Sequence, residues 1–246
     1  MQTVGIDLSA EPKGTAIATV TWSEGGATVS SLQTKAEDDL VLHFLHHPDR
    51  AIGVDCPLGW PVKFVEFVGA HDMGDLVAPS PRTQGWRREF VMRRTDLFVR
   101  ERTGIVPLTV AADRIGHTAL RLAALMSELG PHIDRSRDGR GSVVEVYPAA
   151  ALHIWGLPSR GYKGSTNAHH LDELVDGLQA STPWLDLGLF EQDCRRSDDA
   201  FDAVICALVA KAAKSGRTVP PDDPELARRE GWIHLPDSHL PLTPWR

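Results

Sequence analysis

The sequence of 246 residues has little cysteine and no long hydrophobic run. The three cysteines, Cys56, Cys194 and Cys206, are widely spaced and form no Cys-x-x-Cys pair, so neither a disulfide framework nor a zinc site is predicted. The longest apolar run, residues 203–210, is far shorter than the ~20 residues of a membrane helix. The first residues lack the basic segment and apolar core of a signal peptide. We therefore expect a soluble cytoplasmic protein without a membrane partner.

The chain also lacks an excess of positive charge. It has 33 acidic and 26 basic residues, a net charge of −7. Proteins that coat DNA regardless of its sequence need a basic surface that replaces phosphate counterions, so this class is disfavoured. A local basic groove is still compatible with the sequence. Segment 82–102 contains seven arginines and three acidic residues, and its Trp86 or Phe90 could stack on a base. The alternative is a solvated helix paired with acidic neighbours.

The order of apolar patterns predicts an α/β protein with a mixed sheet and a crossover helix. No linker divides the chain, so we expect one domain, residues 1–246, with inserts at about 56–112 and 148–197. Expected strands are 3–8, 15–22, 27–33, 51–55 and 142–147. Expected helices are 38–47, 62–68, 84–102, 113–129, 167–178 and 198–215. The proline-rich tail is expected to wrap the surface.

Acidic residues occur where these predicted elements would converge. Asp7 ends the first strand, Asp55 ends the fourth, and Glu145 lies in the fifth. Asp199 and Asp202 lie in the first turns of the last helix. If strands one, four and five are parallel, their C-terminal ends meet at one edge of the sheet, where open α/β sheets bind ligands. Taken singly, each could instead accept hydrogen bonds in a turn, face solvent or cap a helix.

Several carboxylates at one edge of the sheet would need a counter-charge. Two of them ~4 Å apart repel by roughly 4 kcal/mol at an effective dielectric of 20. Oxygen ligands suit Mg²⁺ or Mn²⁺, and two such ions ~3.5–4 Å apart can promote phosphodiester hydrolysis. The predicted function is therefore a metal-dependent nuclease or phosphodiesterase.

Several motifs resemble one family along residues 3–215. They are Gly5-Ile6-Asp7, Asp55-Cys56-Pro57-Leu58-Gly59, Arg94-Thr95-Asp96 with Arg100, Glu145-Val146-Tyr147-Pro148-Ala149, Tyr162-Lys163 and Asp199-Ala200-Phe201-Asp202-Ala203. This set resembles the domain-of-unknown-function-429 family, described as predicted nucleases of the ribonuclease H-like fold. The resemblance implies a five-stranded mixed sheet of order 3-2-1-4-5 in which only strand two is antiparallel.

The resemblance also implies a metal and catalytic cluster at Asp7, Asp55, Glu145 and Asp202, with Asp199 as an alternative ligand. Some ribonuclease H-like nucleases have a histidine one turn from the final aspartate, where this chain has Asp198-Asp199. Either Asp199 or Asp202 could therefore complete the site.

Basic residues could hold a nucleic-acid or nucleotide substrate. Arg94, Arg100 and Lys163 are the expected contacts with its phosphates, and Arg160 lies near Lys163 among glycines. The alternative for Arg160 and Lys163 is a plain surface loop.

Two other functions fit the same pattern. A binding module could keep the fold without turnover, which agrees with the acidic net charge. An ATP-dependent phosphotransferase could share the aspartate of strand one, but no Gly-Thr pair follows Asp7 and phosphate-binding glycine motifs are absent. A shift in melting temperature with Mg²⁺, Mn²⁺ or nucleotide distinguishes these possibilities.

Overall fold

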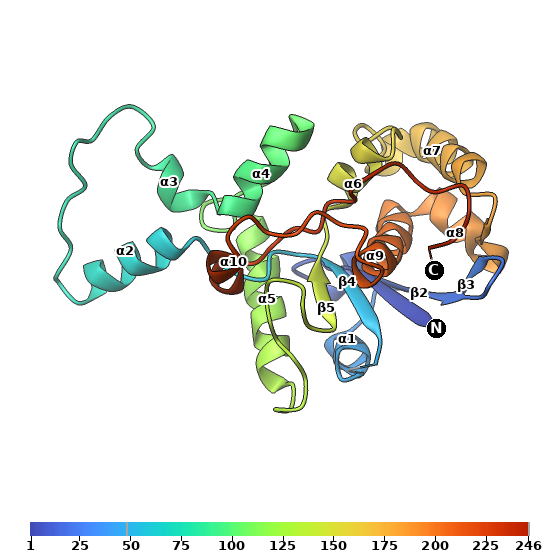
Figure 1. Cartoon of the computed structure of the whole chain (residues 1–246), viewed down its shortest axis with the longest axis horizontal. Helices are drawn as coiled ribbons and strands as arrows, with labels where there is room; N and C mark the ends of the chain where they lie inside the picture. Colours follow the sequence, from blue (N-terminus) through green and yellow to red (C-terminus); the bar gives the residue numbers. More distant parts are fainter. Residues whose placement is uncertain (48, 246) are drawn as a thin grey trace.

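A mixed β-sheet with helices on both faces forms the centre of the protein (Figure 1). The computed structural model describes residues 1–47 and 49–245. In these residues the sheet has six strands in the order β5-β4-β1-β2-β3-β6. The strands are β1 (Gln2–Asp7), β2 (Ala16–Trp22), β3 (Ala27–Thr34), β4 (Ala51–Asp55), β5 (Val143–Glu145) and β6 (Leu185–Asp186).

The strand pairing confirms the expected mixed sheet and adds one strand to it. β2 pairs antiparallel with β1 and with β3, whereas β4 pairs parallel with β1 and β5. The added strand, β6, pairs parallel with β3. It contains two residues, too few for an alternating pattern to be recognised in the sequence.

Helices account for most of the remaining regular structure. The α-helices are α1 (Asp38–Leu45), α2 (Val62–Asp72), α3 (Arg88–Val91), α4 (Arg94–Thr103), α5 (Ile115–Glu128), α6 (Pro148–Ile154), α7 (Ala168–Ser181), α8 (Glu191–Arg196), α9 (Asp198–Lys214) and α10 (Pro224–Glu230). Short 3₁₀ helices lie at Pro12–Gly14, Ser165–Asn167 and Gly188–Phe190. Within the described residues, none of these helices combines the length and hydropathy needed to cross a membrane.

The two faces of the sheet pack against different helices. On one face, Val4 and Ile6 of β1 and Val54 of β4 share a core with residues of α1 and α5. On the other face, the core contains residues of β2, α6, α7 and most of α9. Because successive side chains of a strand point to opposite faces, Gly5 and Asp7 point toward the α9 face. The alternation of side chains along β1 therefore places the Asp7 carboxylate on the α9 face of the sheet.

A pair of glycines brings α9 close to the sheet. Gly5 and Gly53 are register partners in β1 and β4. A Cβ atom on Gly5 would lie 1.9 Å from the carbonyl oxygen of Ala203, and one on Gly53 would lie 2.3 Å from that of Cys206. Only glycine permits this approach of the helix backbone, which places the first turns of α9 above the ends of the two strands.

Segment 84–102 forms two helices instead of the single helix expected there. α3 and α4 are separated by Met92 and Arg93, which have extended backbone conformations. Arg93 is fully buried, so its side chain does not lie on the exposed face of a helix. α2, α3 and the chain between them extend away from the sheet at the left of Figure 1. We call residues 62–91 the arm.

The C-terminal tail does not simply wrap the surface, as its prolines suggested. Trp232, Ile233 and Leu235 are buried, and Ile233 forms a parallel bridge with Glu145 of β5. The backbone N–H of His234 donates to the carbonyl of Glu145 at 2.9 Å. An extended segment can satisfy the free edge of β5 without a regular hydrophobic period, so composition alone did not reveal this pairing.

Candidate metal centre

Three carboxylates from distant segments meet at the C-terminal ends of β1 and β4. Asp7 and Asp55 are register partners in these parallel strands. Asp202 lies in the second turn of α9, and one carboxylate oxygen from each of the three residues lies within 4.8 Å of the others. The oxygens thus have the chemistry and the spacing to hold one hard divalent cation.

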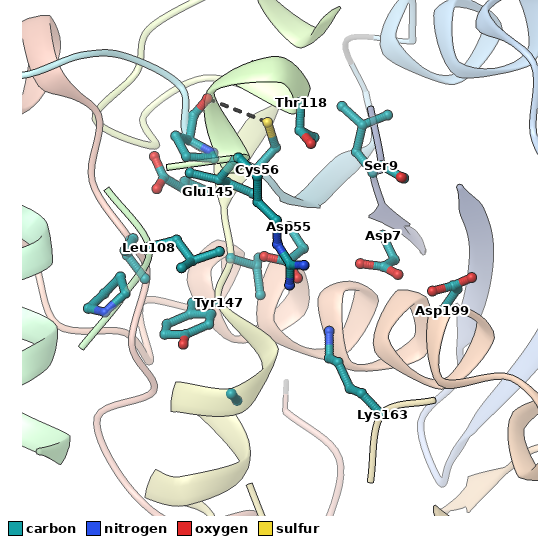
Figure 2. A pocket seen from close by; sticks show the side chains of 18 of the residues that line it. Asp7, Ser9, Asp55, Cys56, Leu108, Thr118, Glu145, Tyr147, Lys163 and Asp199 are labelled. Carbon is teal, nitrogen blue, oxygen red and sulfur yellow. Dashed lines mark hydrogen bonds between the residues drawn. The ribbon is translucent and has the colours of Figure 1, made fainter. Parts of the chain in front are cut away.

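Asp199 lies beside this cluster, one turn before Asp202 on α9. It is half-buried and lines a cavity, and its charge adds to the effect of burial in raising the pKa of Asp7. Figure 2 shows Asp199 next to Asp7, on the side away from Asp55. The helix therefore offers both carboxylates, but Asp202 is the one in the cluster of three.

Burial and mutual repulsion make the carboxylates costly to ionise. The pKa of Asp7 is raised well above its ordinary value, first by burial and then by the charges of Asp202 and Asp55. Burial raises the pKa of Asp55 to about 7, against the attraction of Lys163. The pKa of Asp202 is also raised by burial. A bound cation would relieve this repulsion, so the donor set fits Mg²⁺ or Mn²⁺.

Lys163 supplies positive charge to the same cluster. Its Nζ lies 2.6 Å from Oδ2 of Asp202. Figure 2 shows the ammonium group directed into the space in front of Asp7 and Asp55. These carboxylates raise the pKa of Lys163, although burial opposes them, so the side chain stays protonated. The neighbouring Tyr162 donates a hydrogen bond from its hydroxyl to Oδ1 of Asp202 at 2.9 Å.

The structure does not bring Glu145 into the cluster. Glu145 pairs in register with Val54, so its side chain points away from α9, on the opposite face from Asp55. There it binds Arg93 through two contacts, Nη1 to Oε2 at 2.9 Å and Nη2 to Oε1 at 2.7 Å. The N–H of Leu58 also donates to Oε2 at 2.9 Å. Glu145 is thus neutralised by a buried guanidinium, which also binds Asp96.

Two of the three expected phosphate contacts lie away from the cluster. Arg94 pairs with Asp222, with Nη2 and Oδ2 2.5 Å apart, and with Glu101. Arg100 is exposed on α4. Among the described residues, neither lines the cavity beside the carboxylates, whereas Lys163 does. Arg94 therefore serves to hold α4 to the chain before α10.

A cavity of about 800 Å³ opens beside the carboxylates. Its wall includes an apolar part formed by Ile105, Pro107, Leu108, Ile115 and Tyr147. Figure 2 shows Leu108 and Tyr147 on the side opposite Asp7 and Asp199. The cavity thus has an acidic end and an apolar end.

Two exposed arginines, Arg114 and Arg160, also line the cavity. The glycine-rich surroundings of Arg160 indicated it in the sequence. Arg114 was missed because it lies in the first turn of the expected helix 113–129 and belongs to no recognisable motif; the observed helix begins after it, at Ile115.

Comparison with known proteins assigns the chain to a family but to no function. Residues 5–226 match the model of the family described as protein of unknown function (DUF429), so the chain belongs to that family. No curated protein and no solved structure matches it.

Proposed function

We propose that this protein is a divalent-metal-dependent phosphodiesterase that acts as a nuclease. The observation that carries the proposal is the convergence of Asp7, Asp55 and Asp202, whose oxygens lie within 4.8 Å of one another. Three carboxylates, two of them on buried residues and one on a partly buried residue, are unfavourable for folding alone without an equal number of cationic partners, so a role in binding a cation explains their placement.

The arrangement of the sheet supports a ribonuclease H-like fold. The order β3-β2-β1-β4-β5, with β2 antiparallel to its neighbours, is the arrangement that this resemblance implied. The carboxylates also lie at the C-terminal ends of parallel strands, where open α/β sheets bind their ligands. The short β6 adds to the edge of the sheet farthest from the cluster and leaves that arrangement intact.

Different residues near the cavity would bind the metal ion and the phosphates of the substrate. Asp7, Asp55 and Asp202 would hold Mg²⁺ or Mn²⁺, with Asp199 at the side. Such an ion supplies Lewis-acid polarisation of a phosphodiester and stabilises negative charge as the P–O bond breaks. Arg114 and Arg160 are placed to bind the flanking phosphates, because guanidinium groups pair with phosphate oxygens through two hydrogen bonds.

The size and lining of the cavity favour a substrate with a free end. A volume of about 800 Å³ lies within the usual range for small-ligand sites and is too small for a duplex. Tyr147 and Leu108 offer an apolar surface for a base or sugar at the end opposite the carboxylates. We therefore expect a strand terminus or a small nucleotide phosphodiester to fit better than the middle of a duplex.

The test is cleavage by the purified protein in Mg²⁺ or Mn²⁺. End-labelled single-stranded, duplex and branched nucleic acids and a dinucleotide phosphodiester should be compared. We expect metal-dependent release of short products from single-stranded ends, and a loss of at least ~100-fold in rate in Asp7→Asn and Asp202→Asn. The matched control is Glu24→Gln, an exposed carboxylate in the turn between β2 and β3. Cleavage that persists unchanged in Asp7→Asn would refute the assignment.

The shift in melting temperature on adding metal measures ion binding by each variant, independently of cleavage. Mn²⁺ should stabilise the wild type and Glu145→Gln, whose side chain faces Arg93, but not Asp202→Asn. Stabilisation by Mn²⁺ without cleavage of any substrate would instead indicate a binding module of the same fold.

A further inference from the structure

The ammonium group of Lys163 occupies a place in the carboxylate cluster that a second cation would need. Its Nζ is 2.6 Å from Asp202 Oδ2, and that residue shares the cluster with Asp7 and Asp55. Figure 2 shows Lys163 reaching into this space from a loop that is separate from the strands and from α9. The chain therefore brings its own positive charge to the site.

Contacts on both sides hold Lys163 in this position. The preceding residue, Tyr162, is buried against Phe201 and its hydroxyl donates to Asp202 at 2.9 Å. On the other side, Asn167 Nδ2 donates to the carbonyl of Lys163 at 2.7 Å. The backbone is thus anchored before and after Lys163, whose side chain is 53% exposed and pairs with Asp202.

The charges near the cluster decide how many ions it can hold. The sequence predicted up to five metal-binding carboxylates, enough to balance two divalent ions. The structure pairs one of them, Glu145, with Arg93. The three clustered carboxylates carry three negative charges, which one divalent ion and one ammonium group balance. A second divalent ion would leave an excess of positive charge even if Asp199 joined.

We propose that the site binds a single divalent cation and that Lys163 supplies the second positive charge beside Asp202. This inference rests on the proposed function, because it concerns the same carboxylates. In that arrangement Lys163 is placed to stabilise negative charge on a bound phosphodiester, while the carboxylates hold the ion.

The number of bound Mn²⁺ ions tests the proposal without any measurement of activity. Metal-free protein is titrated with Mn²⁺, free ion is followed by electron paramagnetic resonance, and binding heats are measured by calorimetry. We expect one tightly bound Mn²⁺ per wild-type chain and the spectrum of an isolated ion. Two ions with a magnetically coupled spectrum would overturn this inference but leave the proposed function standing. No bound ion would overturn the proposed function itself.

Two variants of Lys163 test its part directly. Lys163→Met removes the charge, so it should bind the first Mn²⁺ at least about tenfold more tightly or take up a second ion. Lys163→Arg keeps the charge and should still bind one. Lys214→Met, at the far end of α9 and exposed, is the matched control. If Lys163→Met binds Mn²⁺ with the stoichiometry and affinity of the wild type, Lys163 does not limit the ion count. Should this variant misfold, the wild-type and Lys163→Arg counts still decide the question.

Discussion

Single carboxylates in this protein are stabilised or destabilised by what faces them. Glu145 and Asp96 share the buried Arg93 guanidinium, so their charges are compensated inside the fold. Asp7 and Asp55 face mainly other carboxylates and the single ammonium of Lys163. The same residue type therefore has a structural role on one face of the sheet and a candidate metal-binding role on the other.

The pKa of about 7 at Asp55 predicts how stability varies with pH in the absence of metal. A carboxyl group whose pKa is higher in the folded than in the unfolded state stabilises the fold when protonated. That contribution is present below the unfolded pKa of about 4 and is lost as the pH rises through about 7. Asp55→Asn cannot ionise, so its free energy of unfolding should rise relative to that of the wild type between about pH 4 and pH 7, by up to ~1.4 kcal/mol per pH unit, and the difference should level off above pH 7.

Urea denaturation in a chelating buffer measures this difference, with Asp75→Asn as the exposed control. Added Mn²⁺ should stabilise the wild type at pH 8 and have little effect on Asp55→Asn. Parallel pH profiles for the wild type and Asp55→Asn would contradict the assignment.

The convergence of three carboxylates could be predicted from the sequence because strand ends can be recognised. Asp7 and Asp55 both follow apolar strands, and Asp202 interrupts an apolar helix, so all three were found. Glu145 was grouped with them because it also lies in an apolar strand. Its side chain faces the other way because β5 pairs Glu145 with Val54, and no local pattern specifies that register. Arg93, its partner 52 residues away along the chain, could not be identified without the fold.

Among the elements, the contact of α9 with the sheet determines the geometry of the site. Gly5 and Gly53 lie side by side under α9, and Ala203 and Cys206 of the helix lie against them. This close contact fixes how far Asp202 lies from Asp7 and Asp55.

Gly53→Ala should therefore destabilise the protein and disturb the site. The added Cβ would lie 2.3 Å from the carbonyl oxygen of Cys206, so the helix must shift. We expect a loss of ~1–3 kcal/mol in the free energy of unfolding, as for other overpacked cores, and weaker Mn²⁺ binding. Gly69→Ala, in the exposed helix α2 where a Cβ meets nothing within 4 Å, is the control and should be neutral or stabilising by up to ~1 kcal/mol. Equal stability of both variants in urea would argue against this role of Gly53.

Sequence patterns identified the long elements better than the short ones. Strands β1 to β4 and helices α1, α5, α7 and α9 were expected within a few residues of their observed ends. The short elements β6, α6, α8 and α10 have seven residues or fewer and were missed, because so few residues cannot show a period. The break at Met92 and Arg93 was missed because Arg93 leaves the helix to bind Glu145 and Asp96.

For the protein as a unit, the arm is the part that least resembles a packed domain. α2 has no buried residue, and its contacts with α3 include the rings of Phe67 and Phe90, whose centroids are 5.2 Å apart. Trp86 packs on Phe90 in the same small cluster. Arg82 and Arg88 are exposed nearby. The arm as a whole has four basic and four acidic residues, but its exposed arginines are suited to contact the backbone of a nucleic acid outside the cavity.

If the arm binds the substrate strand, its arginines should govern the salt dependence of binding. We expect Arg82→Ala/Arg88→Ala to reduce the slope of log affinity against log salt concentration by roughly 1.5, because each lost phosphate contact accounts for ~0.7–0.9. Fluorescence anisotropy with a labelled single strand in a chelating buffer measures this slope. The control Lys214→Ala/Arg217→Ala removes the same charge from the end of α9 and the chain after it. An unchanged slope in the arm variant would show that the arm takes no part in binding.

The order of the cluster along the chain also has a consequence for protein synthesis. Asp7 and Asp55 emerge early from the ribosome, whereas Asp202 follows Asp7 by 195 residues. At ~5–20 residues per second, the last carboxylate is made roughly 10–40 s after the first. If the cluster binds a cation as proposed, the nascent protein is unable to bind it for most of its translation, and binding of the ion would indicate that the final long helix has docked.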